Sequence, residues 1–233
     1  MAARRPSIIR SVLLAALVAL APAAHAADAA HPTVIELYQS QGCSSCPPAI
    51  ANVNALADRP DVLALTFAVT YWDQLGWKDT FASAAQTSRQ WDYARGFGHA
   101  QVWTPQVIVD GRGDVVGAHA GQIEGLLAKT PPRAGPALTL ATGRVTIGVG
   151  AAPARGADVW LVRFDPRTIA VAVRSGENGG RTIAHRNVVR QLVRLGRWTG
   201  AAAALDLPAP VTGLQTAVLV QASGGPILAA VRG

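Results

Sequence analysis

The two cysteines, Cys43 and Cys46, constrain the fold most, because they lie where a predicted strand gives way to a predicted helix. Residues 33–38 are mostly β-branched or apolar and predict a short strand. Apolar side chains after Pro47 and Pro48 recur on one face, and proline is tolerated in a first helical turn. A disulfide across so short a loop removes little entropy from the unfolded chain, so chemistry explains the pair better than reinforcement does.

The rest of the first half alternates predicted strands and helices. Residues 62–69 form an apolar run typical of a strand buried on both faces. A helical segment, a strand, a turn, a second strand and a short helix follow, at residues 81–97, 106–109, 110–113, 115–118 and 121–129. The order strand, helix, strand, helix, strand, strand, helix predicts an α/β thioredoxin-like domain over residues 27–130.

A segment rich in proline, residues 130–136, interrupts this pattern and marks a domain boundary after residue 130. Beyond it the pattern is of strands, with a turn at residues 177–180. The expected strands are residues 137–149, 157–164, 168–174, 181–195, 213–222 and 227–231. We therefore expect a smaller, mostly antiparallel, sandwich-like β domain over residues 131–233.

Charge also separates the two halves. Residues 27–131 contain six basic and ten acidic side chains, whereas residues 132–233 contain twelve arginines and four acidic side chains. The arginine-rich half is expected to meet an anionic partner, or else to present a solvated basic face. Nucleic acid is not expected as that partner in an exported protein.

Residues 1–26 have the order of a secretory signal peptide: a basic region with Arg4, Arg5 and Arg10, an apolar run over 11–20, and a small-residue cleavage site that ends at Ala26. The apolar run is shorter than the roughly 20 residues that a membrane span needs. We expect a periplasmic or secreted protein that is not an integral membrane protein after cleavage. An uncleaved membrane anchor is the alternative.

A cysteine at a helix N-terminus gains thiolate character from the unpaired backbone N–H groups and the helix dipole. Cys43 is therefore the expected nucleophile, with the more exposed sulfur, and Cys46 the resolving thiol. This predicts a thiol–disulfide oxidoreductase that acts on protein thiols or disulfides without a cofactor. Ser44 and Ser45 bring neither charge nor imidazole, so the redox direction stays undetermined.

Two other functions fit the same pair. In one, the disulfide is inert and the protein is a non-catalytic binding module. In the other, Cys43 and Cys46 carry copper together with a histidine, for which His99 and His119 are the candidates in the first half.

Aromatic side chains are frequent near the predicted strand ends. Trp72 and Trp103 are candidates for the floor of a peptide-binding groove near the cysteines. Packing in the core is the alternative role for aromatic side chains of this kind.

Three segments carry a family resemblance: residues 36–48 around the cysteines, residues 71–77, and residues 104–111. They resemble an exported bacterial family of unknown function within the thioredoxin superfamily, closely over residues 33–130 and loosely beyond. The resemblance implies that Pro105 is a cis-proline beside the cysteine pair. It also implies that the backbone of Thr104 binds an added substrate strand.

The resemblance also suggests a role for Glu36. A carboxylate in this strand resembles the buried proton acceptor of thioredoxins, although its spacing to Cys43 is one residue longer here. If it is buried, Glu36 would exchange a proton with Cys46. A solvated Glu36 that faces outward is the alternative.

Overall fold

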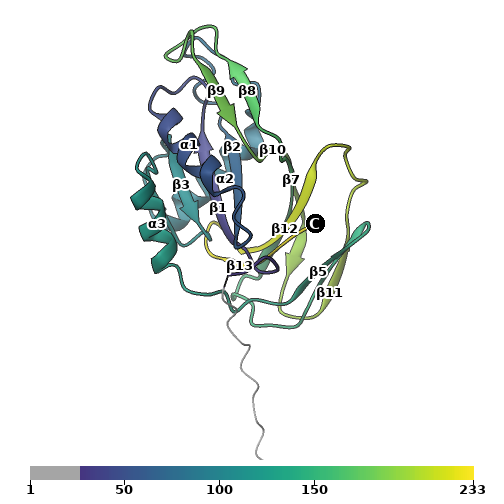
Figure 1. The fold of residues 1–233 in the computed structure, drawn as a ribbon. Helices are drawn as coiled ribbons and strands as arrows, with labels where there is room; N and C mark the ends of the chain where they lie inside the picture. The colour runs from purple at the N-terminus through teal and green to yellow at the C-terminus, as the bar shows by residue number, and fades with distance from the viewer. Residues whose placement is uncertain (1–26) are drawn as a thin grey trace, which may run out of the picture.

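The computed structural model describes residues 27–233, and the predicted signal peptide lies outside them. This range contains three α-helices and thirteen β-strands (Figure 1). The elements up to residue 129 are β1 (Thr33–Gln39), α1 (Cys46–Leu56), β2 (Val62–Ala68), α2 (Ala84–Phe97), β3 (Gln106–Val109), β4 (Gly113–Val115) and α3 (Ala120–Lys129). The strands that follow are β5 (Leu138–Ala141), β6 (Arg144–Ile147), β7 (Ala157–Asp165), β8 (Ile169–Ala172), β9 (Thr182–His185), β10 (Val188–Trp198), β11 (Ala203–Asp206), β12 (Gln215–Ala222) and β13 (Ile227–Arg232).

Up to Lys129, the order of helices and strands agrees with the order expected from the sequence. Strand β1 pairs with β2 in parallel along its whole length and with β3 in antiparallel. Every residue of β2 is buried, as its continuous apolar run predicted. The backbone of β2 on the side away from β1 therefore needs hydrogen-bond partners from elsewhere in the chain.

The predicted fold class, an α/β thioredoxin-like domain followed by a smaller β domain, is wrong. The second half supplies the missing partner of β2, because β10 pairs with it in parallel at Val188 and Thr66. The result is one mixed sheet of eight strands in the order β13-β12-β7-β10-β2-β1-β3-β4. The described chain is thus mostly β, and its main sheet runs through both halves.

The seam between β2 and β10 is held by the residues just before β10. The Thr66 backbone N–H donates to the Asn187 carbonyl (3.0 Å), and the Thr66 hydroxyl donates to the Arg186 carbonyl (2.9 Å). The Asn187 side chain donates to the Ala64 carbonyl (2.8 Å). Asn187 has a positive φ of 48°, which ends β9 before β10 begins. The predicted strand over 181–195 is therefore two strands.

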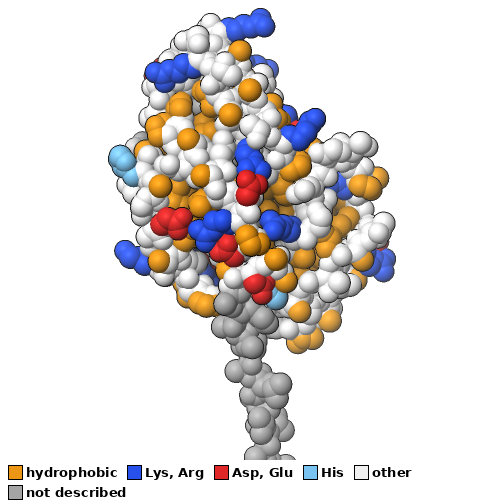
Figure 2. All heavy atoms as spheres, in the orientation of Figure 1, with side chains coloured by type: hydrophobic (Ala, Val, Ile, Leu, Met, Phe, Trp, Pro, Cys, Tyr) orange, Lys and Arg blue, Asp and Glu red, His pale blue; other side chains and the backbone are white. Residues whose placement is uncertain are grey.

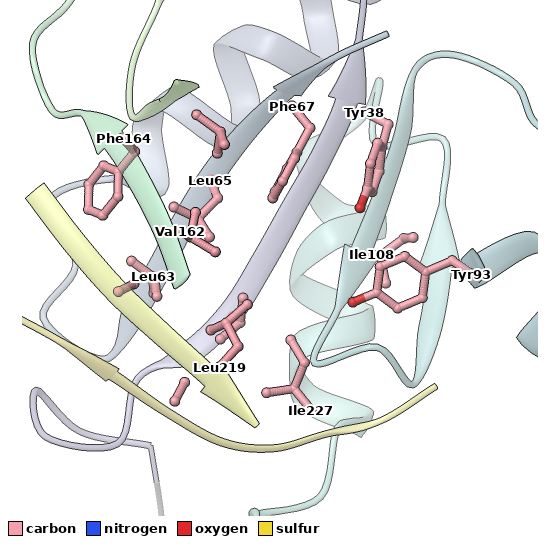
Figure 3. Packing of buried hydrophobic residues seen from close by; sticks show 14 of the residues in the cluster. Tyr38, Leu63, Leu65, Phe67, Tyr93, Ile108, Val162, Phe164, Leu219 and Ile227 are labelled. Carbon is pink, nitrogen blue, oxygen red and sulfur yellow. The ribbon is translucent and has the colours of Figure 1, made fainter. Parts of the chain in front are cut away.

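The eight-stranded sheet curls so that its two halves face each other across an apolar core. The β12–β13 turn reaches α2 so closely that a Cβ on Gly96 would lie 1.8 Å from the Gly224 carbonyl oxygen. The Ile227 N–H also donates to the Asp110 carbonyl (2.8 Å). Side chains from both halves meet inside this curl, among them Tyr38, Leu65, Phe67, Tyr93, Phe164, Leu219 and Ile227 (Figure 3).

The outer faces of the sheet are covered by separate layers. Helices α1 and α3 pack on the side of β1 that carries Ile35 and Leu37. A three-stranded sheet in the order β11-β6-β5 covers the outer face of β7, β12 and β13. The predicted strand over 137–149 is thus the β5–β6 hairpin. No helix of the described residues is long and apolar enough to cross a membrane.

A two-stranded hairpin of β8 and β9 stands beside α1, at the top of Figure 1. The Asn54 side chain of α1 donates to the Ala184 carbonyl (2.8 Å) and accepts from the Arg186 N–H (3.1 Å). Figure 2 shows basic side chains at this end of the molecule. The hydrogen bonds of Asn54 attach the hairpin to the helix that begins with Cys46.

His185 anchors the base of this hairpin in an apolar site. Its ring is fully buried, and neither ring nitrogen has a hydrogen-bond partner among residues 27–233. The ring meets Phe81 edge to face, with centroids 5.4 Å apart. Burial lowers the pKa of His185 to about 4, because the charged imidazolium loses its hydration.

The first prediction concerns acid stability. The pKa of histidine in the unfolded chain is about 6.5, so the unfolded chain binds one more proton than the folded chain as the pH falls from there to about 4. The contribution of His185 to the free energy of unfolding should fall by up to ~3 kcal/mol over this window. His185→Phe should remove that loss. Urea unfolding of both proteins at about pH 7 and about pH 4.5 measures the difference.

The difference in the free energy of unfolding between the wild type and His185→Phe, taken at each pH, isolates the contribution of His185. Burial raises the pKa of Asp79 to about 6, so this carboxyl stabilises the folded state as the pH falls. Its contribution is present in both proteins and cancels in the difference. Parallel pH profiles for the wild type and His185→Phe would contradict the assignment of the acid loss to His185.

Candidate functional site

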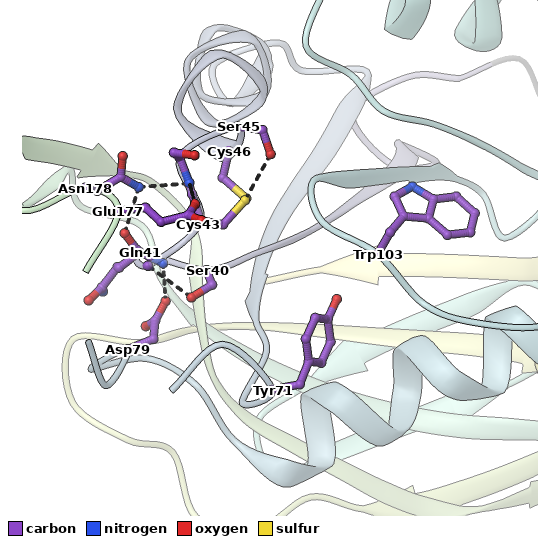
Figure 4. The surroundings of a disulfide bond; sticks show 12 residues. Ser40, Gln41, Cys43, Ser45, Cys46, Tyr71, Asp79, Trp103, Glu177 and Asn178 are labelled. Carbon is purple, nitrogen blue, oxygen red and sulfur yellow. Dashed lines mark hydrogen bonds between the residues drawn. A yellow bond between two sulfur atoms is a disulfide. The ribbon is translucent and has the colours of Figure 1, made fainter. Parts of the chain in front are cut away.

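Cys43 and Cys46 form a disulfide at the start of α1, with their Cα atoms 5.4 Å apart (Figure 4). Ser45 is the residue that precedes the helix, and Pro47 and Pro48 lie in its first turn. The Ser45 hydroxyl lies 3.2 Å from the Cys43 sulfur. A disulfide sulfur carries no proton, so the hydroxyl is the donor. The predicted position of the pair, between β1 and a helix that begins with prolines, is confirmed.

A network of polar side chains fixes the loop between β1 and Cys43. The Gln41 N–H donates to the Asp79 carboxylate (2.7 Å), and the Gln41 side-chain oxygen accepts from the Trp77 indole N–H (2.9 Å). Asp79 is buried, which raises its pKa to about 6. Trp77 and Asp79 therefore support the cysteine loop, and Asp79 lies below Gln41 in Figure 4.

The loop of the β8–β9 hairpin binds the cysteine loop directly. The Asn178 side-chain amide donates to the carbonyl oxygens of Gln41 (2.9 Å) and Cys43 (2.8 Å). The Ser44 N–H donates to the Glu177 carboxylate (3.0 Å), which lowers the pKa of Glu177. Asn178 is fully buried although it lies in a predicted turn. Two consecutive residues from the second half thus hold the disulfide loop.

This arrangement hides the sulfur atoms. Cys43 and Cys46 are both fully buried, whereas Ser44 and Ser45 between them are exposed. Val173 and Ile183 of the hairpin belong to the same apolar cluster as the cysteines. The prediction that the Cys43 sulfur is the more exposed is therefore wrong, because the hairpin was not expected at this position. Any thiol exchange requires a local opening.

Thr104 and Pro105 lie beside the strand that leads to the cysteines. Their peptide bond is cis, as predicted, and Pro105 is buried. Strand β3 pairs with β1 so that Tyr38 faces Gln106, and continuing this register places Pro105 beside Gln39. The Gln39 amide is fully buried, and neither of its polar atoms has a hydrogen-bond partner in the structure.

Glu36 lies on the opposite face of the sheet. Its neighbours in β1, Ile35 and Leu37, share the cysteines' cluster, and side chains alternate along a strand. Glu36 is buried in an ion pair with Arg89 of α2 (2.7 Å). It also accepts hydrogen bonds from the hydroxyls of Tyr38 (2.7 Å) and Tyr93 (2.9 Å). This placement does not fit proton exchange with Cys46.

The two tryptophans take different positions. Trp72 is partly buried against both the cysteines' cluster and the central core. Trp103 and Tyr71 lie on one side of the disulfide, and Asn178 and Glu177 lie on the other (Figure 4). The Trp103 ring packs on the His99 ring, with centroids 4.9 Å apart.

The histidines do not join the cysteine pair. His99 lies 3.4 Å from the Asp114 carboxylate, and His119 is exposed just before α3. Within residues 27–233, no group of three or more His, Cys, Asp or Glu side chains is placed to hold a metal ion. The structure therefore supplies no histidine ligand for the copper alternative.

Four residues of this site are not among those predicted from the sequence: Gln39, Asp79, Glu177 and Asn178. Glu177 and Asn178 were assigned only to a hairpin turn. Their approach to Cys43 depends on contacts between residues more than 130 positions apart, which local pattern does not reveal.

The comparisons with known proteins identify a family and leave the function open. The family model described as a protein of unknown function (DUF1223) matches residues 34–221. No curated protein matches the chain.

Two solved structures are similar. A crystal structure of protein AGR_C_4864 from Agrobacterium tumefaciens has 32% sequence identity and a TM-score of 0.70, and the match covers 87% of this chain and 94% of that one. HBP35 of Porphyromonas gingivalis has 11% identity and a TM-score of 0.54, with 88% and 75% covered, so its likeness is one of fold alone.

The second prediction concerns the hairpin. Asn178→Ala removes two hydrogen bonds to the cysteine loop, each worth about 1 kcal/mol. Opening of the loop becomes easier by about 2 kcal/mol, so dithiothreitol should reduce the disulfide about thirtyfold faster. Quenching the reaction with an alkylating reagent and weighing the products by mass spectrometry gives the rate.

Asn52→Ala is the matched control. The Asn52 side-chain amide projects from α1 and donates to the Gly117 carbonyl, so its removal leaves the contacts of the hairpin with the cysteine loop in place. Its reduction rate should equal that of the wild type. Equal rates in all three proteins would mean that reductant reaches the sulfur atoms without movement of the hairpin.

Proposed function

The chain belongs to the DUF1223 family, and we propose that it is a thiol–disulfide oxidoreductase that works through Cys43 and Cys46. The observation that carries the proposal is the disulfide at the first residue of α1, with the Ser45 hydroxyl on the Cys43 sulfur. A helix N-terminus is the environment that stabilises a thiolate. The cis bond before Pro105, beside the strand that leads to the cysteines, also supports the proposal, because the resemblance to the thioredoxin superfamily implies a cis-proline there.

The exchange reaction needs only the two cysteines and a client dithiol. A client thiolate attacks the Cys43 sulfur, the bond between the two cysteines breaks, and Cys46 leaves as a thiolate that takes up a proton. The second client thiolate attacks the client sulfur of the mixed disulfide, and Cys43 leaves. The client loses two electrons and the pair gains them. The reverse sequence reduces a client, and the proposal covers both directions.

Ser45 and the backbone around it assist the leaving group. The Ser45 hydroxyl can donate to a Cys43 thiolate as it does to the disulfide sulfur. The Ser44 N–H is occupied by the Glu177 carboxylate. Displacement of the hairpin would both expose the sulfur atoms and free this N–H for a developing thiolate.

We place the protein in the periplasm or outside the cell. The order of basic, apolar and small residues over 1–26 supports export. Such compartments allow disulfides to form and persist, whereas the cytosol keeps most thiols reduced. Its partners in this proposal are protein thiols or disulfides.

A non-catalytic binding module remains the second candidate. The observation that favours it is the complete burial of both cysteines beneath the hairpin. In that case the disulfide only fixes the loop between β1 and α1, and the arginine-rich half binds an anionic partner.

The third prediction distinguishes these two functions. Cys46→Ser should accumulate mixed disulfides with client proteins in an exporting bacterial host, because Cys43 can still react but nothing resolves the product. Non-reducing gels followed by mass spectrometry of the trapped species measure this.

Cys43→Ser is the matched variant, since it also leaves one cysteine but removes the expected nucleophile. It should trap few clients or none. If neither variant traps a client although both fold, the binding module is the better description. Equal trapping by both would contradict the assignment of Cys43 as the nucleophile.

A further inference from the structure

Strand β9 of the hairpin has a free edge. Among the described strands it pairs with β8 alone. The Val173 N–H donates to the Arg181 carbonyl (2.9 Å), so the Arg181 carbonyl points toward the β8 side. Because hydrogen-bonded and non-hydrogen-bonded positions alternate along an antiparallel ladder, Thr182 and Ala184 direct their backbone N–H and carbonyl groups away from β8. Both residues are exposed, and an edge of this kind is a template for another strand.

The Asn54 side chain already occupies one end of this edge in the way a strand would. Its amide donates to the Ala184 carbonyl (2.8 Å) and accepts from the Arg186 N–H (3.1 Å). A residue of an added parallel strand would make the same two bonds with its own N–H and carbonyl groups. The edge therefore accepts an amide partner, and the stretch from Thr182 to the Ala184 N–H lies beyond the reach of Asn54.

A groove runs beside this stretch, between β9 and α1. It has a volume of about 440 Å³. Sites that bind ligands have volumes in the range of about 300–1,000 Å³. Its apolar lining comes from both elements: Pro47, Ile50 and Ala51 of α1, and Ile183 and Ala184 of β9. Since Pro47 follows Cys46 directly, the groove reaches the turn of α1 that carries the disulfide.

The charge at the groove favours an acidic partner. Arg181 is exposed and lines the groove, and its guanidinium donates to the neutral side chain of Asn178 (3.1 Å). The nearby Arg186 differs, because it forms an ion pair with Asp58 (2.7 Å). A second copy of the chain that paired through the same edge would bring another Arg181 to it instead of a carboxylate.

We propose that an extended, acidic segment of a client protein adds to β9 as a third strand. Its backbone pairs with Thr182 and Ala184, and one of its carboxylates meets Arg181. This places the client beside the turn that carries Cys46. The word client rests on the proposed function, but strand addition involves no thiol chemistry, so the two proposals can fail separately.

Fluorescence anisotropy of a short labelled peptide, in which valine and glutamate alternate, tests the proposal with the oxidised protein. The peptide should bind the wild type with a dissociation constant below about 1 mM. Thr182→Pro removes one N–H from the free edge and none from the pairing with β8, so the hairpin should tolerate it. It should bind the peptide at least about fivefold more weakly. Thr182→Val keeps the N–H and should bind like the wild type.

Two further peptides separate backbone pairing from charge. A peptide with methylated backbone nitrogens has no N–H to donate and should not bind the wild type, which tests strand addition even if Thr182→Pro does not fold. A peptide with glutamine in place of glutamate should bind the wild type about threefold more weakly. Arg181→Gln should abolish that difference. Arg155→Gln, which removes an exposed arginine before β7, should preserve it.

The proposal is overturned if the acidic peptide does not bind the wild type up to about 1 mM. It is also overturned if Thr182→Pro or the methylated peptide binds equally well. A dimer in light scattering that Thr182→Pro abolishes would assign the edge to a second copy instead. Peptide binding without trapped clients in Cys46→Ser would support strand addition and count against the redox function alone.

Discussion

The pairing of β2 with β10 determines where the other parts of the second half lie. Strand β2 is buried along its whole length, and the Thr66 backbone needs the Asn187 carbonyl on its open side. Because β10 follows the β8–β9 hairpin directly, this pairing sets the hairpin beside α1. Because β7 and β12 continue the sheet beyond β10, the same pairing also places the three-stranded sheet of β11, β6 and β5 over their outer face.

Thiol exchange at the cysteine site requires the β8–β9 hairpin to move, because the hairpin covers the sulfur atoms. A helix N-terminus with a hydroxyl on the Cys43 sulfur favours thiol chemistry, yet Asn178 and the apolar side chains around it exclude solvent from that sulfur. Both observations hold if the hairpin opens locally while the eight-stranded sheet remains intact. Local opening costs less than global unfolding, since few hydrogen bonds join the loops. The binding module requires no such opening.

Local sequence patterns predicted the elements around Cys43 because each depends on neighbours in the chain: the strand before it, the prolines after it and the turn at Asp110. They could not predict the seam, because parallel pairing of β2 with β10 joins residues that are far apart in sequence. For the same reason local pattern indicates only a turn at Asn178 and does not distinguish a Glu36 beneath the cysteines from a solvated one. Glu36 faces Arg89 of α2, and only the three-dimensional path of the helix reveals that.

The central claim is that the Cys43–Cys46 disulfide exchanges electrons with other thiols. Its reduction potential, measured by equilibrating the purified protein with a glutathione series, tests this most directly. The account predicts a value in the range of about −270 to −120 mV that exchange proteins occupy. A value below about −300 mV, which is typical of structural disulfides, would contradict it.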